Sequence, residues 1–370
     1  MTTIRETLPA AHRRLLPAVF DRPEIPERRA TCHDCAMCAK GDAAAAAGAN
    51  ATEISFQPNL KCCTYQPTLP NFLVGAVLSD AAPEIAEGKR RVQERIRSRM
   101  GVTPQWLSPS RKYRVLLDAA RATSFGRSKV LLCPFFVDEG GGLCSIWRHR
   151  EAVCSTFFCK HEAGAAGHAF WTAQKQLLAQ HEVALSRYAA RAVFPDAAEP
   201  AFPRMRLTLE DLEDRPPRSD DYDACWGEWA GREEELYRRT FEVVSALTEE
   251  KVRELLAEEP RTEELIASLG AKYDAAASPR LAERLMLNPD LRATPMGDSG
   301  AMAVTTYSAY DPMMLIPELW AVLPEFKGGE TVAEVKARLD RDQDVEIGDD
   351  LLLILQNHAI LVPVAPTPAP

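Results

Sequence analysis

Hydrophobic positions along the first half of the chain recur mostly at helical spacing. An apolar stretch at residues 71–78 predicts a buried helix or strand, and residues 84–130 have a basic pattern that is mostly helical. Good helix formers fill residues 167–192 and predict one long helix. The chain therefore belongs to the mainly α class on its pattern alone.

The second half continues this pattern with more acidic residues. Pro195, Pro200 and Pro203 mark a boundary, after which helices are expected near residues 222–247, 249–257 and 262–273. Thr248 is a suitable N-cap because Glu249 and Glu250 follow it in the first turn. Trp226 and Trp229 are three residues apart and are expected to pack one helix face.

A compact unit is expected at residues 300–363. Its predicted elements are an apolar helix at 312–323, a second helix opened by the capping box Thr331–Glu334, a third helix from Asp349 and a strand at 360–362. The whole chain then divides into a lead (1–30), a cysteine-cluster domain (31–195), an acidic helical region (205–290), this unit (300–363) and a disordered tail (364–370).

Composition narrows the class of protein. The 370 residues are 46% hydrophobic and 26% charged, which is ordinary for a globular protein, and no run of ~18 apolar residues predicts a membrane span. Charged residues and prolines interrupt the first twenty positions, so no secretory signal is expected and the predicted location is cytoplasmic. The net charge of −9 argues against a protein that coats nucleic acid.

Residues 89–129 are an exception to the acidic balance, with twelve Lys or Arg against two acidic residues. One interpretation is a solvated helix pair whose cations offset thiolates and the acidic second half. The other is a site for nucleic acid or a phosphate-bearing ligand. The stretch lacks the interleaved aromatic residues of a single-strand platform, which favours the first interpretation.

Cysteine provides the clearest chemical signal, because nine of the ten cysteines lie in the first 160 residues. Without an export signal, the reducing cytosol favours metal ligation over disulfides. The candidate metal ligands are Cys32, Cys35, Cys38, Cys62, Cys63, Cys133, Cys144, Cys154 and Cys159. Cys225 stands apart and is expected to be a buried free thiol.

The spacing of these cysteines suits soft metals. Three sulfurs lie within seven residues in the C-x2-C-x2-C run that begins at Cys32, and C-x2-C turns direct two sulfurs at one ion. Cys62 and Cys63 are adjacent and poorly suited to bridge each other, so one or both should point into a metal centre. The flanking cations Lys61, Arg148, Arg150 and Lys160 would offset thiolate charge.

Histidines are weaker candidates. His33, His149 and His161 lie inside the cysteine groups and could each replace a sulfur ligand. The others are expected to be ordinary surface or helix residues; they are His12, His168, His181 and His358.

The run from Cys133-Pro134-Phe135-Phe136 to Cys159 resembles the YkgJ-type cysteine-cluster family, described as zinc- or iron-chelating. The Cys144–Cys154 and Cys154–Cys159 spacings match, as do Trp147 at the aromatic position and Arg150. Glu151 and Ser155 depart from the family pattern, as does the Ala-rich insert before Cys62. The resemblance covers residues 31–162 and implies a zinc or iron–sulfur centre. One branch of the family, flagellin lysine N-methylase, carries an iron–sulfur cluster.

The C-terminal unit is similar, more loosely, to winged-helix peptide-recognition (PqqD-like) domains through the segment F-x-G-G-x-T-V-x-E-V. Residues 311–362 carry eleven acidic and four basic residues, a charge that repels DNA. The unit is therefore either a helical accessory module or a site for a peptide or protein partner.

Three functions follow as hypotheses. The first is metal binding with a structural or redox role, through one centre or two. The second is an iron–sulfur-dependent enzyme that modifies proteins or peptides, and the third is a non-enzymatic adaptor that uses residues 300–363.

Overall fold

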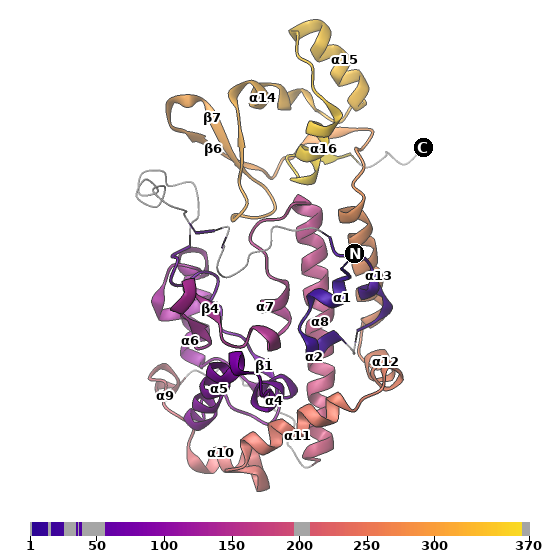
Figure 1. Ribbon diagram of the computed structural model, residues 1–370. Coiled ribbons are helices and arrows are strands. Elements are labelled where there is room, and N and C mark those ends of the chain that lie inside the picture. Colours follow the sequence, from indigo (N-terminus) through magenta and orange to yellow (C-terminus); the bar gives the residue numbers. More distant parts are fainter. Residues whose placement is uncertain are drawn as a thin grey trace.

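The computed structural model describes residues 2–13, 16–25, 35, 37–38, 56–195 and 208–364. It is mainly helical, as the sequence predicts, and one long helix, α8 (Gly164–Val193), runs through its middle (Figure 1). This helix was expected at residues 167–192. Its buried side chains include Phe170, Leu177 and Leu185, so tertiary packing stabilises it along most of its length.

Shorter helices surround α8. Before it come α1 (Ile4–Thr7), α2 (Ala10–Arg13), α4 (Asn71–Ser79), α5 (Ala86–Ser98), α6 (Arg111–Ser124) and α7 (Ala152–Thr156). After it come α9 (Leu209–Leu212), α10 (Ser219–Trp226), α11 (Glu233–Ser245), α12 (Glu249–Ala257), α13 (Thr262–Ala277), α14 (Pro317–Val322), α15 (Val332–Gln343) and α16 (Asp349–Asn357). Short 3-10 helices are η1 (Ala18–Asp21), η2 (Pro83–Ile85), η3 (Lys129–Leu131), η4 (Glu139–Gly141), η5 (Trp147–His149), η6 (Gly227–Trp229), η7 (Gly297–Ser299) and η8 (Leu323–Glu325).

The apolar stretch at 71–78 forms α4, a helix buried along nearly its whole length. It packs against both α8 and α11. A Cβ atom on Gly75 would lie 1.9 Å from the carbonyl oxygen of Tyr237 on α11. Only glycine therefore permits this close helix crossing.

The acidic helices follow the prediction with one break. The helix expected at 222–247 is divided into α10 and α11, because Gly227 and Gly231 adopt positive φ angles of 50° and 82° between them. Trp226 and Trp229 are buried in one core, but they lie on successive helices, α10 and η6, and not on one helix face. The Thr248 cap is confirmed by a hydrogen bond of 3.2 Å from the Lys251 N–H to its hydroxyl.

Strands are short and antiparallel. In the first half β1 (Leu69–Pro70) pairs with β2 (Trp106–Leu107), and β3 (Phe136–Val137) pairs with β4 (Leu143–Cys144). Near the end, β6 (Arg292–Met296), β7 (Ala301–Thr305) and β8 (Met313–Leu315) form a three-stranded sheet, and β5 (Leu285–Leu287) pairs with β9 (Leu361–Pro363).

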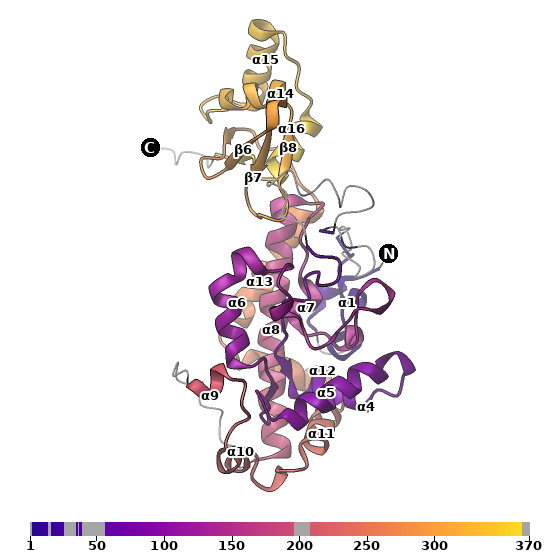
Figure 2. The same cartoon turned by 90° about the vertical axis from the view of Figure 1, so that its left-hand side faces the viewer.

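We call residues 281–364 the C-terminal module, because one hydrophobic core joins Leu281 and Leu285 to Leu361. The Thr331–Glu334 capping box is confirmed. The apolar helix expected at 312–323 is instead strand β8 followed by α14. The module sits beyond one end of α8 in both views (Figures 1 and 2).

The basic segment finds partners inside the molecule. Arg91 donates to the Phe136 carbonyl at 2.6 Å, and Arg95 donates to the Ser108 carbonyl at 2.7 Å. On α6, Arg111 pairs with Asp211 at 2.9 Å. The Arg111–Asp211 pair is the kind of contact that the first interpretation expects, and the choice between the two interpretations stays a prediction.

None of the helices in the described part of the chain combines the length and the apolar character that crossing a lipid bilayer requires.

Candidate metal centre

The candidate ligands lie in turns and on very short elements. Cys62 and Cys63 lie in the turns that precede β1, and Cys144 ends β4 opposite Phe136. Cys154 lies in α7, which begins after Glu151, and Cys159 follows that helix. Cys32 lies outside the described residues. All nine described cysteines, Cys225 among them, are free thiols.

Four of these cysteines pack together as a first group: Cys35, Cys38, Cys62 and Cys159. Their shared core contains Met37 and Phe56, and Phe56 N–H donates to the Met37 carbonyl at 2.8 Å. Cys38 N–H donates to the Cys35 carbonyl at 3.1 Å, which closes the turn between the two cysteines. Segments about a hundred residues apart in sequence therefore meet here.

Aromatic side chains cover the first group. Phe125 meets Phe56 and Phe157 edge to face, with ring centroids 5.3 and 5.6 Å apart. Tyr310 comes from the loop between β7 and β8 of the C-terminal module, and its ring lies 5.7 Å from Phe56. Asp311 accepts the His161 N–H at 3.2 Å beside it. The C-terminal module thus contributes to the surroundings of these cysteines.

The other four form a second group: Cys63, Cys133, Cys144 and Cys154. Cys133 N–H donates to the Cys63 carbonyl at 2.7 Å. Cys63, Cys133 and Cys144 belong to the main hydrophobic core. Cys154 lies near enough to Cys133 and Cys144 for their charges to influence it.

Burial is the main influence on four of these thiols. It raises the pKa of Cys38 to about 12, with a further contribution from Cys35. It also raises the pKa of Cys133, Cys154 and Cys159. Low-dielectric surroundings disfavour a thiolate without a cation, so these thiols are neutral at physiological pH unless a positive charge joins them.

Cys62 and Cys63 join the two groups. The two side chains hydrogen-bond to each other, which lowers the pKa of Cys62 and raises that of Cys63. Lys61, itself buried, donates to the carbonyls of Gly141 and Gly142. A proton shared between adjacent sulfurs favours one thiolate over two.

Three of the four flanking cations influence the pKa of a cysteine thiol. Lys61 and Arg150 both lower the pKa of Cys62, and Lys160 opposes the raised pKa of Cys159. Arg150 stacks on Trp147 at 3.3 Å and donates to the Cys154 carbonyl at 3.0 Å. Arg148 instead pairs with Glu84 at 3.1 Å.

The first turn of α7 is held by two buried carboxyl groups. Glu151 accepts the Val153 N–H at 2.6 Å and the Cys154 N–H at 2.9 Å. Glu182 of α8 accepts the Ala152 N–H. Three backbone donors that a helix N-terminus leaves without partners are satisfied here, which fixes the backbone of Cys154.

Glu182 also contacts His12, whose Nε2 lies 2.8 Å from its carboxyl. Burial lowers the pKa of His12 to about 4 and raises the pKa of Glu182. The pair is therefore neutral, because burial disfavours both charges. His12 and His181 were expected to be ordinary surface or helix residues, and both are buried. Sequence offered no signal for this contact, since its partners lie 170 positions apart.

The other histidines are placed as follows. His149 Nε2 lies 2.8 Å from Asp80, so a carboxylate rather than a cysteine group takes that nitrogen. His161 lies among His168 and Tyr307 where α8 meets the C-terminal module. His33 lies outside the described residues.

Within the described part of the chain, no three or more His, Cys, Asp or Glu side chains converge in the manner of a metal site. The cysteines of each group are neighbours that do not surround a common point. Cys side chains change direction by rotation about a single bond. The convergence of four sulfurs on one ion stays a prediction.

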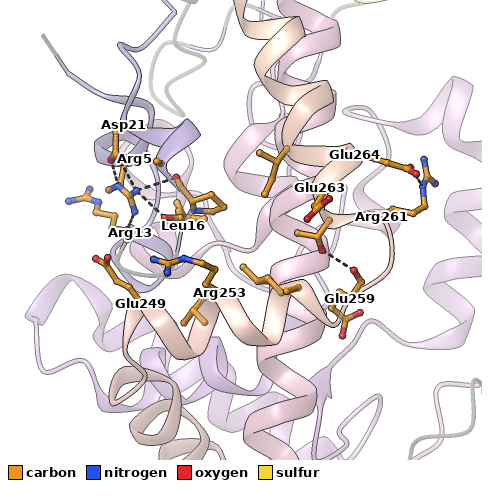
Figure 3. A pocket seen from close by; sticks show the side chains of 17 residues that line it. Arg5, Arg13, Leu16, Asp21, Glu249, Arg253, Glu259, Arg261, Glu263 and Glu264 are labelled. Carbon is orange, nitrogen blue, oxygen red and sulfur yellow. Dashed lines mark hydrogen bonds and ion pairs between the residues drawn. The ribbon is translucent and has the colours of Figure 1, made fainter.

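A cavity of about 990 Å³ lies elsewhere, between the N-terminal segment and helices α12 and α13 (Figure 3). Arg5, Arg13 and Arg253 line it together with acidic residues such as Glu249, and none of the described cysteines or histidines does. Arg5 is already paired with Asp21 at 2.5 Å. The cavity therefore offers none of the soft ligands found in the two cysteine groups.

Comparisons of the chain with protein-family models, curated proteins and solved structures found no match.

Proposed function

We propose that this chain is a metal-binding protein that holds zinc or an iron–sulfur cluster through its clustered cysteines. The observation that carries the proposal is the gathering of eight free thiols from separate segments into two adjoining groups. Both kinds of centre use soft thiolate ligands in sets of four. The residues that would hold the metal are the members of the first and second groups.

The cysteines and the side chains around them are suited to a zinc ion or an iron–sulfur cluster. Buried thiols with raised pKa values give up their protons when a metal replaces them, so metal affinity and folding are coupled. Lys61 and Arg150 lie where they would offset the negative charge of a four-thiolate centre. Bound zinc would supply a structural cross-link, and an iron–sulfur cluster would add one-electron redox chemistry.

Elemental analysis of anaerobically purified protein tests the proposal. Cells should be grown with both zinc and iron, and the protein should carry at least about one equivalent of zinc, or iron with acid-labile sulfide and visible absorption. The Cys154→Ser variant should lose metal, whereas the matched control Cys225→Ser should keep it. Protein that purifies with neither metal and binds neither on reconstitution would contradict the proposal.

One observation favours an adaptor role in addition. The C-terminal module exposes Met314, Ile316 and Ile354, although its interior is well packed. Met314 and Ile316 lie two positions apart in extended backbone, so both can belong to one apolar patch, and such patches are typical of contact with a partner protein or peptide. Replacing Met314 and Ile316 with Ser should abolish any such association in pull-down experiments without lowering metal content.

A further inference from the structure

Seven of the eight cysteines divide between two different hydrophobic cores. Cys62 packs with Met37 and Phe56, whereas the adjacent Cys63 packs with Cys133 in the main core. The division falls at one peptide bond, which directs the two side chains toward different neighbours. Cys35, Cys38 and Cys159 share the core of Cys62, and Cys133 and Cys144 share the core of Cys63. Cys154 lies outside both cores but close enough to Cys133 and Cys144 for their charges to influence it.

Each set contains four cysteines, which is the number of ligands that one metal centre takes. A structural zinc ion takes four ligands in tetrahedral geometry, and a four-iron cluster also takes four thiolates. Eight thiols exceed what either centre can use alone. A single centre would leave four thiols without a role, beside charged side chains such as Lys61 and Arg150 that suit thiolates.

Backbone contacts support each set separately. In the first set, the hydrogen bond between Cys38 and Cys35 forms a turn of the kind that presents two sulfurs to one ion. In the second set, the Cys133 N–H donates to the Cys63 carbonyl, and Cys144 lies on the strand that pairs with the segment after Cys133. Glu151 fixes the backbone of Cys154.

We infer that the chain holds two separate four-cysteine centres, joined by the Cys62–Cys63 peptide bond. The first uses Cys35, Cys38, Cys62 and Cys159, and the second uses Cys63, Cys133, Cys144 and Cys154. This inference rests on the proposed function and adds the ligand set and number of the centres. The first centre lies beneath Tyr310 of the C-terminal module, and the second lies in the main core beside α7.

Counting the metal in the wild-type protein is the first test. Native mass spectrometry and elemental analysis should give about two zinc ions per chain, or about eight iron atoms if both centres are four-iron clusters. A chain that binds no metal would overturn the proposed function. A chain that saturates at one zinc ion or one cluster would leave that function intact and overturn the two-centre inference.

The adjacent pair provides matched variants. Cys62→Ala should remove about half of the metal and expose Cys35, Cys38 and Cys159 to alkylation, while the second set stays protected. Cys63→Ala should give the reverse pattern, with Cys133, Cys144 and Cys154 exposed. Cys225→Ala is the control and should change neither pattern. Loss of all metal in both variants would indicate a single cluster with shared sulfurs.

Stepwise chelation of the wild-type protein gives the same information without variants that could fail to fold. Alkylation followed by mass spectrometry should show thiols released in two blocks of four, with the membership given above. Release of all eight together, or in blocks of different membership, would overturn the inference.

Discussion

The region that contains the cysteines and the C-terminal module differ in the kind of side chain they bury. The buried polar and charged side chains of the described residues all lie at or before Thr262. The C-terminal module has an interior of Leu, Val, Ile and Phe. The cysteine region, residues 56–163, instead buries Glu151, Lys61 and the thiols of Cys133 and Cys159, and its strands are only two residues long.

This difference indicates two ways of stabilising a fold. Burial of apolar surface stabilises the module without assistance, at about 25 cal/mol per Å². Short strands and 3-10 turns contribute little of that kind, and buried polar groups cost free energy unless each finds a partner. We therefore expect the cysteine region to depend on specific bonds, both to metal and within its buried hydrogen-bond network.

Metal removal should separate the two regions most strongly. Treatment with a strong chelator should abolish hydrogen-exchange protection in residues 62–160, because the free energy of metal binding stabilises the folded state there. Protection in α15 and in the β5–β9 pair should persist. Hydrogen exchange followed by mass spectrometry measures both. Simultaneous loss of protection in the module would show that the two regions unfold as one unit.

Variants of Glu182 test the buried hydrogen-bond network without changing any cysteine. Glu182→Leu should lower the free energy of unfolding by about 2–4 kcal/mol, because the Ala152 N–H and His12 lose their partner in the interior. Glu182→Gln should stay much closer to wild type, since the raised pKa of Glu182 makes it a neutral acceptor already. Chemical denaturation compares the two variants, and equal losses would contradict this account of the network.

The sequence predicts some of these features and misses others for physical reasons. Helix α8, the Thr248 cap and the Thr331–Glu334 box depend on local pattern, and all three are confirmed. The strands β6 and β7 escaped prediction because neither buries alternate residues: β6 has no buried residue, and the two buried residues of β7 are neighbours. Packing of Cys159 against Cys35 depends on the path of the chain through space.

The candidate site shows the same limit. Spacing alone singled out the cysteines, but it left open whether they form one set or two. Their division appears only where Cys62 and Cys63 enter different cores. The burial of His12 was missed because its partner, Glu182, is supplied by a helix far along the chain.

His12 gives a pH-dependent form of the comparison. Its pKa is about 4 in the folded protein, below the ordinary 6.5, so the unfolded chain takes up a proton that the folded chain refuses. The resulting contribution of His12 to the free energy of unfolding is complete above pH 6.5. It is lost as pH falls toward 4, by up to about 3 kcal/mol. His12→Gln removes this term, while Glu182, Glu151 and His181 around it remain.

Urea denaturation at several pH values measures the effect. Wild type should lose more stability than His12→Gln between pH 6.5 and 4. Subtracting one pH profile from the other removes the acid response of the groups that both proteins share. Parallel pH profiles for the two proteins would contradict the neutral buried pair.

The smallest effect is expected for nucleic acid, where we predict no binding by the basic segment. Many of its cations already have partners: Arg91 and Arg95 donate to carbonyl groups, and Arg111 pairs with Asp211. A segment that bound nucleic acid would lose affinity with salt, by about 0.7–0.9 log units per log unit of salt for each phosphate contacted. Titration with single- and double-stranded oligonucleotides at low and moderate salt tests this.

Arg90 and Arg97 are exposed, so changing both to Gln probes the surface while leaving the internal contacts of Arg91 and Arg95 intact. Micromolar binding that weakens with salt and with this double change would assign the cations to a phosphate ligand. Absence of binding at low salt would leave them to balance thiolates and acidic helices within the same chain.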